Sequence, residues 1–214
     1  MSSSVASMAT RTRMSREARQ DQLLDLGAEL FADRSYEDVH IEELSEVAGV
    51  SRGLLYHYFP TKRAFFAAMV RRESGRMIET TVTDPSLPVL DQLKQGIETY
   101  LDYCEDHKLG VKAIFHGAAS ADPEIQEIIE QDLRVHHDRI IAVVEPNGRS
   151  TELMRIAVRS WLQFMRSACH QWLDAQEATR DEIRDLCAQT LVGALMALPE
   201  GSRPSGLAGL TPSD

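Results

Sequence analysis

Apolar side chains recur every three to four residues along almost the whole chain, and no segment alternates strictly between apolar and polar positions. The first periodic segment runs from Arg16 to Asp33, and shorter ones follow from Ile41 to Ala48 and from Ser51 to Tyr58. Spacings of three to four residues place side chains on one face of an α-helix, whereas the side chains of a strand alternate at every residue. The pattern therefore predicts an all-α fold.

A segment with two prolines, Thr83 to Pro88, interrupts the helical pattern and is the best candidate for a domain boundary. A fourth helix is expected before it, from Thr61 to about residue 82. Five more are expected after it, over 89–104, 111–119, 122–140, 151–175 and 180–198. The expected organisation is a disordered arm (1–14), a small helical domain with its linking fourth helix (15–82), a larger helical domain (83–198) and a disordered Gly/Pro/Ser-rich tail (199–214).

The charge is distributed unevenly over the 214 residues, whose net charge is −10. Residues 1–76 hold 11 basic and 11 acidic side chains, so the negative charge lies entirely in the remainder. Nucleic-acid binding is therefore permitted in the N-terminal part and disfavoured in the C-terminal part. No apolar run approaches the roughly 18–20 residues that span a bilayer. Because the Ser/Ala-rich start lacks a signal-like apolar core, a cytoplasmic protein without a membrane partner is expected.

The three cysteines, Cys104, Cys169 and Cys187, lie in apolar helical segments and form no CxxC motif. Buried reduced thiols are the expected state, with disulfide formation or redox sensing as the alternative. The histidines are scattered, and no HExxH motif or dense Cys/His cluster occurs. We therefore expect no metal and no cofactor.

Two short helices joined by Ala48-Gly49-Val50 follow the plan of a helix-turn-helix, in which glycine supplies the positive φ of the turn. The outer face of the second of these helices carries Arg52, Gly53, Tyr56 and His57. Hydrogen-bond donors and flat aromatic groups on such a face suit the edges of bases in the major groove. A packed aromatic cluster at a helix corner is the alternative explanation.

The stretch AGVSRGLLYHYFPTK, from Ala48 to Lys62, closely resembles the DNA-binding domain of the TetR family of bacterial repressors, and the resemblance extends over about residues 16–72. It implies DNA contacts from the recognition helix and its flanks. The residues concerned are His40, Ser51, Arg52, Gly53, Leu54, Tyr56, His57, Tyr58 and Lys62. Lys62 falls where a phosphate contact is usual, and a helix N-terminus favours an anion independently.

The chain departs from the family pattern at Val39-His40, Glu42 and Leu54, which leaves the operator sequence open. The basic arm with Arg11, Arg13 and Arg16 either reaches phosphates or a minor groove, or is a solvated tail.

The resemblance also implies a C-terminal helical domain that dimerises through its last two helices and encloses a ligand pocket. Apolar stripes there suggest interface residues, although intramolecular core must claim part of each stripe: Trp172, Leu186, Thr190, Leu191, Ala194 and Leu195. The pocket candidates are amphipathic or soft side chains, for which ordinary core packing is the alternative: Tyr100, Cys104, Phe115, His116, His136, Trp161 and Met165.

The sequence therefore predicts a ligand-responsive transcriptional regulator, and specifically a repressor. It is expected to bind a palindromic double-stranded operator as a homodimer and to be released by a small hydrophobic effector. No nucleophile elbow, phosphate-binding glycine loop or other catalytic motif is present, so we do not expect an enzyme. An all-helical enzyme and a helical interaction protein that does not bind DNA are the competing interpretations.

Overall fold

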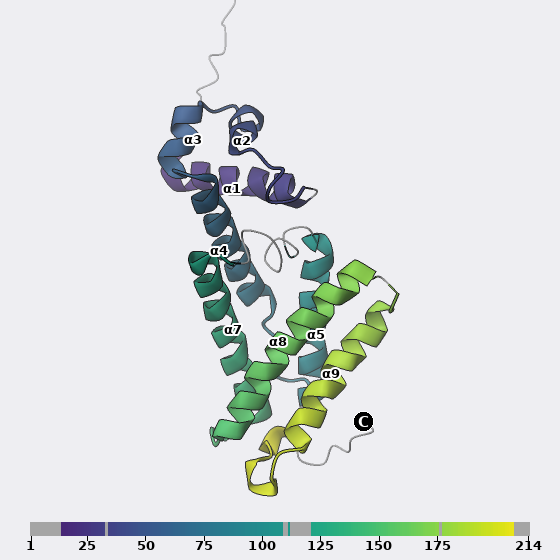
Figure 1. Ribbon diagram of the computed structural model, residues 1–214. Helices are drawn as coiled ribbons and strands as arrows, with labels where there is room; N and C mark the ends of the chain where they lie inside the picture. Colours follow the sequence, from purple (N-terminus) through teal and green to yellow (C-terminus); the bar gives the residue numbers. More distant parts are fainter. Residues whose placement is uncertain (1–13, 33, 109–110, 112–120, 176, 208–214) are drawn as a thin grey trace, which may run out of the picture.

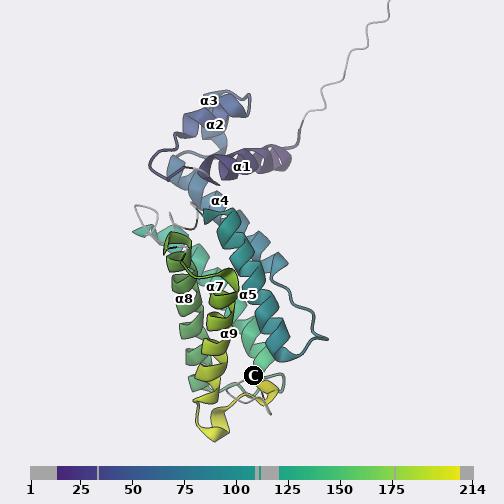
Figure 2. The same cartoon turned by 90° about the vertical axis from the view of Figure 1, so that its right-hand side faces the viewer.

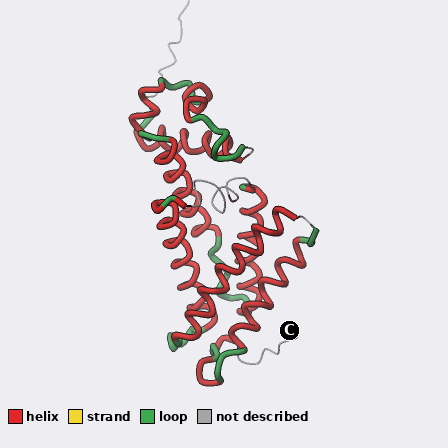
Figure 3. Tube along the Cα trace, viewed as in Figure 1, coloured by secondary structure: helices red, strands yellow, loops and turns green. Residues whose placement is uncertain are grey.

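The computed structural model describes residues 14–32, 34–108, 111, 121–175 and 177–207, and these residues form helices and loops without a strand (Figure 3). Within these ranges the α-helices are α1 (Arg16–Ala32), α2 (Ile41–Val47), α3 (Arg52–Tyr58), α4 (Lys62–Thr80), α5 (Val89–Asp106), α7 (Pro123–Val144), α8 (Glu152–Ala175) and α9 (Arg180–Met196). The predicted all-α fold is confirmed. The helix expected over 111–119 lies, apart from Val111, outside the described residues.

Helix α4 joins the two parts of the molecule (Figure 1). Helices α1, α2 and α3 gather around its N-terminal end, whereas the rest of α4 lies along α7. Helices α5, α7, α8 and α9 form the larger part, in which α8 and α9 run antiparallel beside one another (Figure 2). The segment 81–88 connects α4 to α5. The division into domains at residues 82 and 83 stays a prediction.

Aromatic rings fill the space between α1 and α4. The rings of Phe31 and Phe66 have centroids 5.2 Å apart, and those of Phe59 and Phe65 are 4.8 Å apart in an edge-to-face arrangement. Gly27 of α1 faces this cluster, and a Cβ atom there would lie 2.1 Å from Cζ of Phe65. Only glycine lets α1 and α4 approach this closely, so Gly27 determines how the small domain packs against α4.

Residues 199–207 do not form the disordered tail that their composition suggests. They make two short 3₁₀ helices, η2 (Glu200–Ser202) and η3 (Ser205–Leu207). The N–H and the hydroxyl of Ser205 each donate to the Glu145 carboxylate at 2.8 Å, and Leu207 is buried. These contacts hold the segment against the C-terminal end of α7, which composition alone cannot reveal. The expected arm at 1–13 and the residues 208–214 lie outside the described residues.

None of the described helices is both long enough and apolar enough to cross a membrane.

Candidate functional site

The turn between α2 and α3 depends on a glycine. Gly49 has a φ of 62°, in the left-handed region that other residues rarely adopt. The N–H of Val50 donates to the carbonyl of Ser45 at 3.0 Å and closes the turn. Ser51 then caps α3, because its Oγ accepts the N–H of Leu54 at 3.2 Å. The predicted helix-turn-helix is thereby confirmed.

The two faces of α3 differ in burial. Leu55 is fully buried, and Phe59, directly after α3, is nearly so. These two residues fix α3 to the small domain. The remaining surface of α3 and its cap is exposed and carries Ser51, Arg52, Gly53, Leu54, Tyr56 and His57, and His40 at the start of α2 is exposed as well. Seven of the nine residues assigned to DNA contacts are thus accessible, and the contacts themselves stay predictions.

Acidic side chains of α2 lie beside the donors of α3. The Tyr56 hydroxyl donates to Oε1 of Glu42, and this bond lowers the pKa of Glu42 and raises the pKa of Tyr56. On the same side, Nη2 of Arg52 lies 3.9 Å from Oε1 of Glu46. If Tyr56 and Arg52 contact DNA as predicted, a base edge or a phosphate must compete with these carboxylates for them.

Tyr58 is less accessible than the other aromatic residues of α3. It is half-buried, since it follows the buried Leu55 by three residues and shares its side of the helix. The guanidinium of Arg16 lies 5.8 Å from the centroid of its ring. Arg16 also marks the start of α1, whereas the arm residues Arg11 and Arg13 lie outside the described residues.

Lys62, the first residue of α4, is also half-buried. Its Nζ donates to the carbonyl of Glu37 at 3.2 Å and lies 4.6 Å from the centroid of the Tyr36 ring. Burial lowers the pKa of Lys62. The phosphate contact stays a prediction, and it requires the ammonium group to turn away from Glu37 or to bridge both partners.

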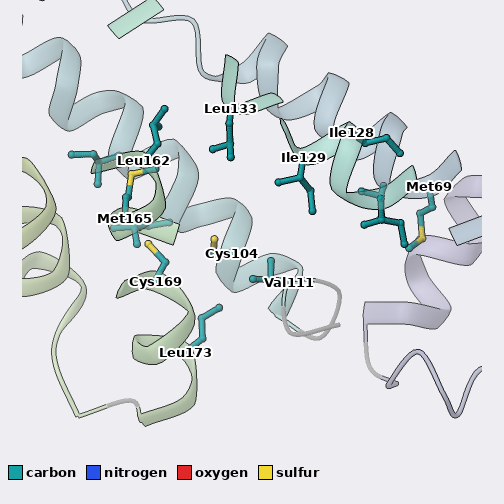
Figure 4. Packing of buried hydrophobic residues seen from close by; sticks show 14 of the residues in the cluster. Met69, Cys104, Val111, Ile128, Ile129, Leu133, Leu162, Met165, Cys169 and Leu173 are labelled. Carbon is teal, nitrogen blue, oxygen red and sulfur yellow. The ribbon is translucent and has the colours of Figure 1, made fainter. Parts of the chain in front are cut away.

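A cavity of about 470 Å³ lies between α4, α5, α7 and α8. This volume is within the range of about 300–1,000 Å³ that is typical of small-molecule sites. Much of its wall is apolar, with residues from all four helices that include Val70, Met77, Leu93, Ile97, Leu133 and Leu162. Figure 4 shows Leu133, Leu162 and Met165 with other buried residues of this region.

Four of the seven predicted ligand-binding residues line this cavity: Tyr100, His136, Trp161 and Met165. Burial raises the pKa of the Tyr100 hydroxyl, so this group keeps its proton. Trp161 is fixed in the wall, because its Nε1 donates to the carbonyl of Cys187 at 2.8 Å. Phe115 and His116 lie outside the described residues. Ligand binding by any of these residues is still a prediction.

Cys104 was expected in the pocket, but it is not among the residues that line the cavity. It is fully buried, as are Cys169 and Cys187 (Figure 4 labels Cys104 and Cys169). Hydrogen bonds with Cys104 and Cys187, together with burial, raise the pKa of the Cys169 thiol. All three cysteines are free thiols within the core.

The cavity also contains charged residues that the sequence analysis did not assign to it, among them Asp132 and Arg139, which share a face of α7 with the predicted His136. Asp132, His136 and Arg139 of α7 line it at spacings of four and three residues, which put them on one face of the helix. Oδ1 of Asp132 accepts the hydroxyl of Ser74 at 3.0 Å and lies 3.4 Å from Nε2 of His136. The sequence shows the spacing of these residues, but it does not show that this face of α7 is turned inward. Among the described residues, no three potential metal ligands come together.

The exposed face of the α8–α9 pair is partly apolar. Leu153, Ile156 and Phe164 of α8 are 47%, 52% and 36% exposed, and Leu186 of α9 is 49% exposed. Of the predicted interface residues, Trp172, Thr190 and Ala194 are half-buried. Leu191 and Leu195 have no exposed surface within the single chain, and their assignment to an interface stays a prediction. Their side of α9 faces the core, and the exposed residues of α8 were missed because both faces of that helix carry apolar residues.

Comparison with known proteins agrees with this architecture. The sequence model of bacterial regulatory proteins of the tetR family matches residues 23–69. The transcriptional activator FasR of Mycolicibacterium smegmatis is 27% identical over 61% of this chain and 68% of its own. The transcriptional repressor AcnR of Corynebacterium efficiens is 26% identical over 53% of this chain and 61% of its own.

Solved structures extend the likeness beyond the small domain. A tetR-family regulator from Streptomyces coelicolor superposes with a TM-score of 0.78, at 25% identity and over 86% of this chain and 82% of its own. Two others share the fold and hold ligands. LfrR of Mycobacterium smegmatis, in complex with proflavine, has a TM-score of 0.56 at 21% identity over 86% of this chain and 100% of its own. FadR of Bacillus subtilis, in complex with stearoyl-CoA, has a TM-score of 0.62 at 15% identity over 84% of this chain and 99% of its own.

One assignment follows from the glycine turn, the exposed face of α3, the family match across both and the structural likeness over most of the chain. The chain belongs to the tetR family of bacterial regulatory proteins, and α1 to α3 form its helix-turn-helix DNA-binding domain.

Proposed function

We propose that this chain is a ligand-responsive transcriptional repressor that binds a palindromic operator as a homodimer and leaves it when a small, mainly apolar effector binds. One observation carries the proposal: α4 belongs to both parts of the molecule. Lys62 begins α4 beside the recognition helix, and Val70, Ser74 and Met77 of the same helix line the cavity. An occupant that displaces α4 must therefore also displace the helix-turn-helix domain.

Ion pairs between α4 and α7 support such coupling. Arg63 pairs with Asp122, the N-cap of α7, and Nη2 of Arg71 lies 3.1 Å from Oε1 of Glu124. Single exposed ion pairs contribute little, about 0–1 kcal/mol. They nevertheless favour one placement of α4 against α7, and the ligand would favour another. A coupling free energy of about 1–3 kcal/mol between the two sites would suffice for induction.

The exposed apolar residues of α8 and α9 support the homodimer. Leu153, Ile156 and Phe164 on α8 and Leu186 on α9 would leave water if two copies paired through these helices. A two-fold axis there would present two copies of α3 to DNA. The operator would then be approximately palindromic, with half-sites about one helical turn of DNA, or a small multiple of it, apart.

Fluorescence anisotropy with the DNA that flanks the gene tests this function. The full-length protein should bind a palindromic segment much more tightly than random DNA of equal length. Arg52→Ala should weaken this binding, whereas Arg149→Ala in the loop after α7 is the charge-matched control. A transcription assay from the flanking promoter separates a repressor from an activator. Equal affinity for flanking and random DNA would contradict the proposal and favour a helical interaction protein.

The relatives do not indicate which effector this chain binds. The two ligand-bound neighbours hold chemically different molecules, proflavine and stearoyl-CoA, within one fold. The effector class must therefore be deduced from the side chains of this cavity.

A further inference from the structure

Arg139 of α7 belongs both to the cavity wall and to the contact between α7 and α4. Its side chain lines the cavity. Its Nη1 also donates to the carbonyl of Ile78, in the last turn of α4, and lies 3.3 Å from Oγ1 of Thr81, the residue that caps α4. One guanidinium group therefore connects the cavity wall with the C-terminal end of the helix that leads to the DNA-binding domain.

The described partners of Arg139 are both uncharged oxygens. Within the described residues, its Nε and Nη2 have no hydrogen bond. A guanidinium binds a carboxylate through two parallel hydrogen bonds, and such charge-assisted pairs are about twice as strong as bonds between neutral groups. An anionic group inside the cavity would therefore compete well against the Ile78 carbonyl for Arg139.

We propose that Arg139 selects an effector with an anionic head group, a carboxylate on an apolar body, and that pairing with this head group draws the guanidinium away from α4. This inference rests on the proposed function, because it specifies the ligand and the transmission step of the same cavity. The apolar body lies against Leu93, Ile97, Leu162 and Met165.

Some of the other charges in and around the cavity oppose the binding of an anion. Asp132 lies seven residues before Arg139 on the same face of α7, about 10 Å along the helix axis. Its carboxylate and the net charge of −10 of the whole chain both favour a cationic ligand. Preference for an anion therefore depends on short-range contacts with the two arginines that line the cavity, Arg139 and Arg166, of which Arg139 also contacts the end of α4.

The consequence for α4 follows from its C-terminal hydrogen bonds. Helix C-termini carry a partial negative charge, which a nearby cation stabilises. Thr81 closes the last turn by donating from its Oγ1 to the carbonyl of Met77 at 2.7 Å, and Arg139 is the cation beside it. Removing Arg139 from this end weakens the last turn and releases α4 from α7 at the level of the cavity.

Three ligands with the same chain and different head groups test the head-group assignment: octanoate, octylamine and octanol. Calorimetry below their micelle concentrations should show that the full-length protein binds octanoate about tenfold or more tightly than octanol. Arg139→Gln should abolish this preference, and Arg139→Lys should retain part of it. Arg134→Gln, an exposed arginine of the same helix outside the cavity, is the matched control and should behave like the wild type.

Hydrogen exchange tests the transmission step separately. Octanoate should accelerate exchange of the amides in the last turn of α4 in the wild type. Arg139→Gln should show fast exchange there without ligand and no further change with it. Octylamine binding as tightly as octanoate, or an unchanged octanoate preference in Arg139→Gln, would overturn the assignment of Arg139.

These results can be distinguished from a failure of the proposed function. If octanoate binds through Arg139 and accelerates exchange in α4 but leaves operator affinity unchanged, the induction mechanism is wrong and the ligand assignment stands. If octanoate weakens operator binding equally in the wild type and in Arg139→Gln, the function stands and the role of Arg139 is excluded.

Discussion

The DNA-binding domain and the larger domain, which encloses the cavity, are both built from α-helices. The first places its functional side chains on an exposed helix face, and the second places them on faces that are turned inward. In α3, the buried Leu55 only holds the helix in place, and the side chains assigned to function are exposed. In α7, the exposed side is ordinary surface, and Asp132, His136 and Arg139 face the cavity. A surface site needs one helix held at the correct angle. An interior site needs four helices to leave a space of defined shape and charge.

This difference has energetic consequences. Changes to exposed residues of α3 should alter binding and leave the fold intact. Changes inside the larger domain should alter stability first, because interiors are close-packed and charged groups are costly there.

Two aspartate substitutions on α9 should show the largest contrast. Leu191→Asp places a carboxylate where the side chain has 0% exposure, and we expect a loss of about 4 kcal/mol or more in unfolding free energy. Leu186→Asp makes the same change at a position that is 49% exposed, so the fold should survive and the dimer should weaken. Thermal denaturation and sedimentation measure the two effects. An intact dimer in Leu186→Asp would place the interface elsewhere.

Glycine substitutions test how rigidly the small domain is attached to α4. Gly27→Ala forces a methyl group against the Phe65 ring, which Phe31 and Phe59 hold from other sides, and should destabilise the fold by about 1–3 kcal/mol. Gly75→Ala within α4 meets no atom within 4 Å and should stabilise the helix by about 0.5–1 kcal/mol. Denaturant titrations should therefore give shifts of opposite sign. A neutral Gly27→Ala would mean that α1 moves freely on α4.

Substitutions near α3 should separate two kinds of DNA contact without affecting stability. Tyr56→Phe removes the hydroxyl that now donates to Glu42, and it should change base preference at a cost of about 1 kcal/mol at the operator. Lys62→Ala should weaken binding to all sequences alike and reduce the slope of log affinity against log salt by about 1. Operator and random-DNA titrations at several salt concentrations measure both. An unchanged slope for Lys62→Ala would exclude its phosphate contact.

The smallest expected effect is a loss of stability in acid, and it arises from an ion pair in the DNA-binding domain. The hydrogen bond from Arg34 lowers the pKa of Glu43 to about 2, from an ordinary value of 4.5. Because the folded-state pKa is depressed, this stabilisation is fully present above pH 4.5 and is lost as the pH falls towards 2. Glu43→Gln should reduce the pH dependence of the unfolding free energy in this window. Arg34→Gln should have the same effect, and the double variant should show no further reduction. Additive effects of the two changes would show that the pair is not coupled.

Much of the DNA-binding domain could be predicted from the sequence because its determinants are local. The turn needs a residue that tolerates a φ of 62°, and Gly49 supplies it within a few residues of the helices that it joins. The period of α3 turns Tyr56 about 100° away from the buried Leu55, and so towards solvent. Tyr58 and Lys62 are less accessible than expected, since their burial depends on Arg16, Tyr36 and Glu37 from the preceding segments.

In the larger domain, the sequence alone determined the helices and their approximate ends, because helical period and caps such as Asp122-Pro123 act within a few residues. Only the tertiary structure decided which face of each helix is buried. It placed Leu191 in the core and left Leu186 exposed, and it buried Cys104 without including it in the cavity lining. It also brought Arg139 to Ile78, a residue 61 positions away in the sequence. An amphipathic pattern shows that a helix has an apolar side, but the partners of that side depend on the packing of distant segments, which no local spacing encodes.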